Sequence, residues 1–275
     1  MPLDQLDFEE PKQLGTPEKE MSFLDHLEEL RWHLIRSVIA VGIIGILTFL
    51  AKDFVFGTIV LGPTKPEFIS YQIICQLIQS LPFEANCLVP PDFNFITPVF
   101  GEPFILHIKV SVVLGLIFSF PYLFWEFWRF VRPGLYEKER KAARGVVFIC
   151  SFLFLTGVLF GYFVIAPFAV TFLMSYELPG LVQASPSYSS YVNYLTLFTG
   201  PAGLVFQLPV VVYFLSKVGL LTPQFMRTYR RHAIVGILLL SATITPPDVM
   251  TQFLIGIPLY ILYEISIVIC KRVTT

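Results

Sequence analysis

Charged side chains are scarce in this chain: Asp, Glu, Lys and Arg make up 14% of its 275 residues, whereas 55% are hydrophobic. A mean hydropathy of +0.70 is typical of a membrane protein. The formal net charge is −1, so the bulk charge gives no indication of nucleic-acid binding. The composition therefore predicts a membrane protein with no nucleic-acid partner.

The motifs of common catalytic sites are also missing. The sequence contains no Walker-type phosphate loop and no H-E-x-x-H, G-x-S-x-G or C-x-x-C motif. Its four histidines are scattered without the spacing of metal ligands: His26, His33, His107 and His232. The first 30 residues are acidic and polar, so we expect no cleavable signal peptide. The sequence predicts neither an enzyme nor a bound cofactor or metal.

Six apolar stretches are present, and they predict an all-α membrane protein with six transmembrane helices. The expected spans are about 34–51, 104–128, 146–174, 194–218, 233–245 and 253–270. Residues 1–20 predict a disordered tail, and residues 22–33 a short amphipathic helix at the membrane surface. Residues 52–103 form a long, proline-rich external loop with a short helix near 69–81. The remaining chain, 21–272, leaves no stretch for a second globular domain.

The connectors between these stretches alternate in basic charge. The N-terminal tail, the second and fourth connectors and the C-terminal end hold sixteen of the nineteen basic residues: Lys12, Lys19, Arg31, Arg36, Arg129, Arg132, Lys138, Arg140, Lys141, Arg144, Lys217, Arg227, Arg230, Arg231, Lys271 and Arg272. The opposite connectors hold only Lys52 and Lys65, and Lys109 lies inside a span. By the positive-inside rule, both termini are expected in the cytoplasm.

The last two spans are short. Residues 233–245 would form about 20 Å of helix, against a hydrocarbon core of about 30 Å. Prolines inside the other spans, such as Pro121, Pro167 and Pro209, predict kinks. The spacing Gly157-xxx-Gly161 suits a close contact between helices.

Two cysteines, Cys75 and Cys87, lie in the external loop, where disulfides persist. A bridge would close a loop of about 13 residues and stabilise the fold by about 3 kcal/mol. From the residues alone, the bridge and two free thiols are equally compatible with the sequence.

A few ionisable or polar groups lie within the apolar stretches: Lys109, Glu126, Gln207 and Glu264. Such groups are costly in a membrane and are either functional or paired. Lys109 could extend to the external interface, Gln207 could bond a neighbouring helix, and Glu264 could be protonated or pair with an arginine. At the cytoplasmic face, carboxylates including Glu29 and Glu139 could bind guanidinium groups or pair with nearby arginines.

Four segments together resemble the TatC family, the receptor subunit of the twin-arginine protein translocase. They are Phe23-Leu-Asp-His-Leu-Glu-Glu-Leu-Arg31, Arg132-Pro-Gly-Leu-Tyr-Glu-Lys-Glu-Arg140, Phe206-Gln-Leu-Pro209 and Thr245-Pro-Pro-Asp-Val249. The resemblance runs from about residue 21 to residue 272, and it implies kinked helices that form a concave face. The external loop is longer than in the common bacterial pattern, so the resemblance does not cover its fold.

The resemblance also implies function. TatC-like proteins bind the twin-arginine signal peptides of folded cargo in the bacterial inner membrane. They work in an oligomeric complex with TatA- and TatB-type subunits, driven by the protonmotive force. On the family's pattern, Glu29 and Glu139 contact the arginine pair, with Arg31 beside the first. Gln207 replaces a residue that is often glutamate on the concave face, and Asp248 matches the acidic residue of an external turn.

Two other functions are compatible with parts of the sequence. A secondary transporter could use Lys109, Gln207 and Glu264 as a midplane site, although the two halves show no internal repeat. An intramembrane hydrolase could use Ser111 or Ser119 with His107, although no orienting group is apparent.

Overall fold

A computed structural model describes residues 23–80, 89–90, 94–131, 143–175, 185–244 and 249–274. Within these ranges the chain is helical apart from short connectors and one isolated β-bridge between Ile96 and Ser187. The predicted all-α fold is therefore confirmed for the described residues. The tail 1–20 and three candidate residues, Cys87, Glu139 and Asp248, lie outside these ranges.

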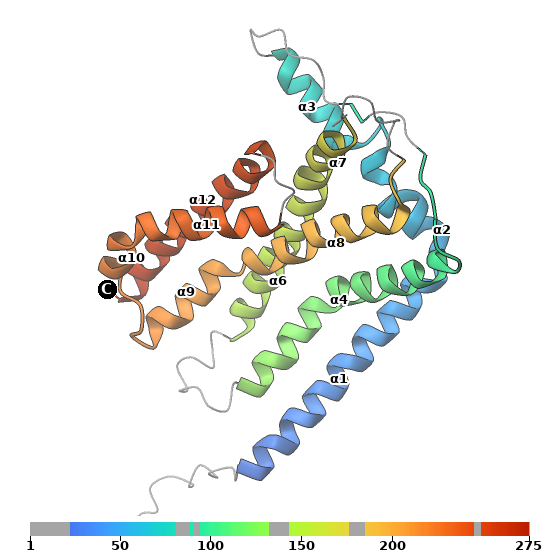
Figure 1. The fold of residues 1–275 in the computed structure, drawn as a ribbon. Coiled ribbons are helices and arrows are strands. Elements are labelled where there is room, and N and C mark those ends of the chain that lie inside the picture. Colours follow the sequence, from blue (N-terminus) through green and yellow to red (C-terminus); the bar gives the residue numbers. More distant parts are fainter. Residues whose placement is uncertain are drawn as a thin grey trace, which may run out of the picture.

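The first half of the chain pairs two long helices. Helix α1 (Phe23–Leu50) is continuous, so the expected amphipathic segment is the first part of the same helix as the first span. The short elements α2 (Lys52–Phe54), the π-helix η1 (Val55–Val60), the 3₁₀ turn η2 (Gly62–Thr64) and α3 (Ile69–Ser80) follow. Helix α4 (Glu102–Val131) then runs back along α1 (Figure 1).

The second half contains broken helices. Helix α6 (Ala143–Phe160) continues through the π-helix η4 (Gly161–Ile165) into α7 (Ala166–Ser175). Helix α8 (Tyr188–Val205) ends just before Gln207, and α9 (Leu208–Lys217) starts with Pro209 in its first turn. The last elements are α10 (Pro223–Thr228), α11 (Arg230–Ile244) and α12 (Val249–Thr274). Pro209 lacks a backbone N–H, which accounts for the new helix start there.

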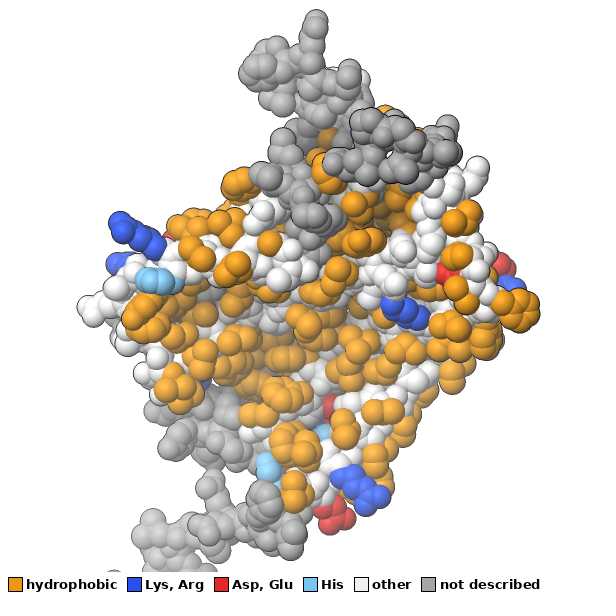
Figure 2. Space-filling view, viewed as in Figure 1, with side chains coloured by type: hydrophobic (Ala, Val, Ile, Leu, Met, Phe, Trp, Pro, Cys, Tyr) orange, Lys and Arg blue, Asp and Glu red, His pale blue; other side chains and the backbone are white. Residues whose placement is uncertain are grey.

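Five segments of the described chain are long and apolar enough to cross a membrane. They are His26–Leu50, Glu102–Val131, Gly145–Ser175, Tyr188–Lys217 and Thr251–Thr274. The fifth expected span, 233–245, overlaps α11, which has 15 residues and is about 22 Å long at about 1.5 Å per residue. Hydrophobic side chains cover most of the described surface in the view of Figure 2. Because soluble proteins rarely expose such continuous apolar surface, a membrane environment follows.

Close glycine contacts bring α6 and α8 together, as the Gly157-xxx-Gly161 spacing predicts. A Cβ on Gly157 would lie 2.6 Å from the carbonyl oxygen of Ala202, and one on Gly161 would overlap the carbonyl oxygen of Phe198. Neither backbone oxygen can move aside. Apolar side chains from η4, α7, α8, α11 and α12 pack into one buried cluster around Phe198. This cluster connects α11 and α12 to the rest of the bundle.

Candidate binding site where α1 begins and α4 ends

Helices α1 and α4 lie side by side in opposite directions, so the start of α1 is next to the end of α4 (Figure 1). They approach each other closely at Gly45 and Gly115: a Cβ on Gly115 would lie 3.0 Å from the Cα and N atoms of Gly45. At the other end of the pair, the ring of His107 stacks on Phe49 with 3.9 Å between centroids. Its Nε2 is 2.9 Å from the Phe49 carbonyl oxygen.

A buried ionisable pair joins the two helices near the start of α1. The Nδ1 atom of His33 lies 2.5 Å from an Oε atom of Glu126, and Glu126 is 1% exposed. A nitrogen of Arg129 lies 4.0 Å from the other carboxylate oxygen. The ring of Phe130 stacks on His26 and meets His33 edge-on. The sequence pattern named Glu126 as a polar group but did not identify His33 as its partner.

Glu29 lies on α1 one helical turn before His33, so the two share a face of that helix. Its side chain is half-buried, and Oε2 is buried without a hydrogen-bond partner among the described residues. An unsatisfied carboxylate oxygen is costly, which makes this position suited to bind a cation. Arg31 is exposed. Glu139 lies outside the described residues, in the connector that follows the last residue of α4, so the predicted proximity of Glu29 and Glu139 stays a prediction.

The polar groups inside the spans have separate partners. Lys109 donates a hydrogen bond to Asn193 of α8. The amide nitrogen of Gln207 donates to the Cys150 carbonyl oxygen of α6 at 2.9 Å.

Glu264 accepts from Arg230 at 2.7 Å and from the Tyr260 hydroxyl at 2.9 Å. Glu264 is thus paired with an arginine, one of the two alternatives that the sequence left open. Because Lys109, Gln207 and Glu264 bind different groups, the structure does not assemble them into the single site that a transporter would need.

The side chains of Ser111 and His107, the pair of the hydrolase alternative, are not hydrogen-bonded to each other. The Ser111 hydroxyl donates to the His107 backbone carbonyl at 2.8 Å, while the His107 ring bonds the Phe49 backbone. Ser119 is buried, and its hydroxyl has no partner among the described residues. This arrangement does not activate a nucleophile, which needs a base within hydrogen-bond reach.

Cys75 takes part in a disulfide, whereas Cys150 and Cys270 are free and buried. Since Cys87 is outside the described residues, the bridge between Cys75 and Cys87 stays a prediction.

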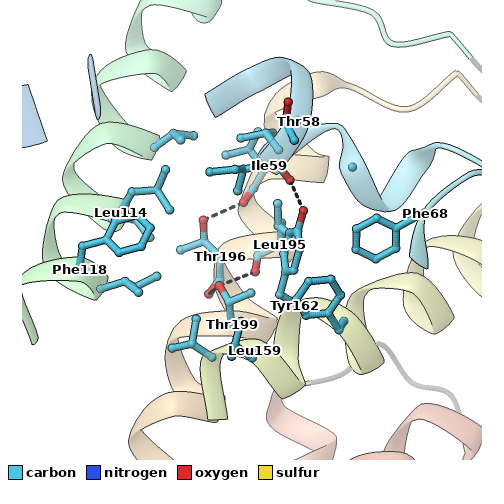
Figure 3. A pocket seen from close by; sticks show the side chains of 18 of the residues that line it. Thr58, Ile59, Phe68, Leu114, Phe118, Leu159, Tyr162, Leu195, Thr196 and Thr199 are labelled. Carbon is cyan, nitrogen blue, oxygen red and sulfur yellow. Dashed lines mark hydrogen bonds between the residues drawn. The ribbon is translucent and has the colours of Figure 1, made fainter. Parts of the chain in front are cut away.

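An apolar cavity of about 670 Å³ lies between the 55–69 segment and helices α4, α6 and α8. Figure 3 shows Leu114 and Phe118 on one side and Tyr162, Thr196 and Thr199 on the other. The hydroxyls of Thr196 and Thr199 donate to carbonyl oxygens of their own helix, so their protons are not free to bond a molecule in the cavity.

Three tyrosine hydroxyls donate hydrogen bonds to the backbone of the 55–64 segment, which lines this cavity. Tyr162 donates to the carbonyl oxygen of residue 59 at 2.7 Å, Tyr191 to that of Val60 at 2.6 Å, and Tyr71 to that of Pro63 at 2.8 Å. A tyrosine hydroxyl is protonated at neutral pH, and burial raises the pKa of Tyr71 further. Sequence analysis missed this feature, because the three tyrosines are far apart in the chain and share no motif.

Five apolar spans, a buried ionisable pair between two of them and an apolar surface define the class of protein as a multi-pass helical membrane protein. The model of the family "Sec-independent protein translocase protein (TatC)" matches residues 25–258. The chain therefore belongs to the TatC family, whose members are non-enzymatic components of a protein translocase.

Relatives in several bacteria have the same family name. The Sec-independent protein translocase protein TatC of Blattabacterium sp. subsp. Periplaneta americana (strain BPLAN) is 36% identical over 93% of this chain and 97% of its own length. That of Aquifex aeolicus (strain VF5) is 34% identical over 92% of this chain and 96% of its own length. A solved structure, "Crystal Structure of Twin Arginine Translocase Receptor- TatC", has 33% identity and a TM-score of 0.68. It covers 91% of this chain and 100% of its own.

Proposed function

We propose that this chain is the receptor subunit that captures twin-arginine signal peptides, with Glu29 and Glu139 as the two carboxylates that bind the arginine pair. The observation that carries the proposal is the buried, unpartnered Oε2 atom of Glu29. Glu126 is already paired with His33, whereas Glu29 has capacity for a new donor. Arg31, which is exposed and lies two residues after Glu29, is the third residue of the proposed binding site.

Arginine fits this site better than lysine does. A guanidinium offers several N–H donors in a planar fork that matches a carboxylate, whereas an ammonium is a compact point charge. A hydrogen bond to a charged group contributes about 1.5–3 kcal/mol. Two such contacts, one from each carboxylate, are enough to distinguish an arginine pair from a single arginine.

The topology that the proposal requires has six spans, with both termini in the cytoplasm. The alternation of basic residues supports this orientation. It places the start of α1 and the end of α4 at the cytoplasmic face of a bacterial inner membrane. α11 would then be the fifth span, and the bilayer would thin around its 15 residues.

The proposed partners are TatA- and TatB-type single-span subunits in an oligomeric complex, together with the signal peptides of folded cargo and the membrane lipid. The protonmotive force drives export. Gln207 supports a role without proton transfer at its position, because an amide does not titrate. Its Oε1 atom is buried and has no partner among the described residues, so it has capacity for a donor from a partner helix.

The test is cross-linking of a twin-arginine signal peptide to the full chain in membranes. Glu29→Ala and Glu139→Ala should each abolish capture while the protein still inserts. Glu28→Ala is the matched control, since Glu28 is an exposed carboxylate next to Glu29 and should be dispensable. Undiminished capture by both the Glu29 and Glu139 variants would refute the assignment.

A further inference from the structure

We propose that His33 and Glu126 are positioning residues: their buried contact sets the rotation of α1 against α4 and so fixes where the carboxylate of Glu29 stands. The inference rests on the proposed function and assigns a role to two residues outside the carboxylate pair itself. It starts from the 2.5 Å contact between the two side chains and the 1% exposure of Glu126.

Helix α1 buries few of its residues. Apart from the contacts of His26 and His33, its described polar and ring contacts with α4 lie toward its C-terminal end, at Thr48 and Phe49. In its most apolar stretch only 6% of the residues are buried, against 33–44% in the other four spans. Lipid tails are as apolar as leucine side chains, so apolar contacts in a membrane do not strongly favour one face of a helix over another. A polar pair does, because each partner left facing lipid would lose its hydrogen bond.

The glycine contact does not control this end of the helix. Gly45 is twelve residues after His33, about 18 Å along the axis. It sets how closely the helices approach in the middle. The His33–Glu126 contact and the stacking of His26 on Phe130, with 4.4 Å between centroids, set the arrangement where α1 begins.

The position of Glu29 follows directly from that arrangement. Glu29 is one turn from His33 on the same face of α1, so a rotation of α1 by one residue would turn it by about 100° away from α4. Glu126 is five residues before Val131, where α4 ends and the connector with Glu139 departs. The pair therefore joins the start of α1, which carries Glu29, to the last turns of α4, the helix that precedes Glu139 in the chain.

The pair also gives Glu126 and Glu29 different roles. His33 satisfies Glu126, so this carboxylate is unavailable to an incoming arginine. The Glu29 oxygen is not satisfied. Specifying one register is the best-documented use of a buried ionic pair, whereas its net effect on stability is often small.

The experiment measures the affinity of the full chain, in its native membranes, for synthetic signal peptides with an Arg-Arg or a Lys-Lys pair. The main variant is the double substitution His33→Leu/Glu126→Leu, which leaves no unpaired buried charge. The swapped variant His33→Glu/Glu126→His restores the pair in reverse. His107→Leu is the matched control, because it removes a histidine contact between the same helices at their other end.

The double leucine variant should lose about tenfold or more in affinity for the Arg-Arg peptide, as loss of an orienting partner does elsewhere. It should also lose most of its preference for the Arg-Arg peptide over the Lys-Lys peptide, while the midpoint of its thermal unfolding changes little. The swapped variant should recover much of the preference, and His107→Leu should keep it. Equal weakening of both peptides, or equal effects of the double leucine and His107 variants, would overturn the positioning role.

Failure of the proposed function is distinguishable from failure of this inference. If the unmodified chain shows no preference for the Arg-Arg peptide, both the proposed function and the positioning role are refuted. If it shows the preference and the double leucine variant retains it in full, only the inference falls.

A second measurement covers the case in which the double leucine variant does not insert. Cysteines replacing His26 and Phe130 report on the arrangement directly, because these rings stack. The native background is low, since Cys150 and Cys270 are buried and Cys75 is already bridged.

Disulfide formation between positions 26 and 130 should be rapid in the chain with His33 and Glu126. It should be several-fold slower when Glu126 alone is replaced by Gln or by Leu. Unchanged rates in both variants would refute the inference.

Discussion

Adding one methyl group at Gly161 should destabilise the bundle, whereas the same change at Gly200 should not. A Cβ at position 161 would overlap the Phe198 carbonyl oxygen and lie 2.9 Å from the Thr199 Cα atom, both backbone atoms of α8. At Gly200, inside α8, a Cβ meets nothing within 4 Å. The two substitutions are chemically identical, so the difference between their effects reports the contact between η4 and α8.

The magnitude follows from two opposing effects. Alanine favours a helix over glycine by about 0.5–1 kcal/mol, and Gly200→Ala should show that gain. Overpacking against atoms that cannot move costs about 1–3 kcal/mol, and at Gly161 it outweighs the gain. The free energies of unfolding of the two variants should therefore differ by about 1–3 kcal/mol.

The assay is reversible unfolding by denaturant in lipid–detergent micelles, with the unmodified chain as reference. Gly161→Ala should shift the midpoint down and Gly200→Ala should leave it unchanged or raise it. Equal midpoints for the two variants would show that α8 does not approach η4 at Gly161, and the described packing would be refuted.

Tyr191→Phe should destabilise the protein by about 1–2 kcal/mol, because it leaves the buried Val60 carbonyl without its 2.6 Å donor. Proteolysis of the 55–64 segment should accelerate in this variant and not in the control Tyr194→Phe, whose ring is exposed. Equal rates of proteolysis in the two variants would show that the Tyr191 hydrogen bond does not hold this segment in place. Gln207→Glu should be less stable than Gln207→Leu at neutral pH. A carboxylate cannot donate to the carbonyl oxygen of Cys150 that the amide donates to. Thermal unfolding of the purified variants tests this order, and the reverse order would refute it.

Much of the fold could be predicted because a lipid bilayer restricts which segments can cross it. A span has to be long and apolar, and the five long spans correspond to predicted apolar stretches. Helix α3, predicted over 69–81, is observed over Ile69–Ser80. The length of the apolar stretch also predicted a short span at 233–245, and the helix observed there, α11, has only 15 residues.

The candidate site was predictable only in part. Motif residues such as Glu29 and Arg31 could be named because family motifs are local in sequence. The partner of Glu126 could not be named, since His33 is 93 positions away and its pairing depends on how α1 is rotated. Gln207 was expected to bond a neighbouring helix, but its acceptor, 57 positions away, required the structure.

The sequence by itself determined the membrane environment, the apolar segments and the family. Each of these follows from local composition or from motifs along the chain, and hydrophobicity acts on each segment separately. Only the tertiary structure decided which polar groups meet and which are left without a partner. It paired His33 with Glu126 and left the Oε2 atom of Glu29 unsatisfied. The physical reason is that a membrane selects for apolar length but not for helix rotation, which depends on specific contacts between helices.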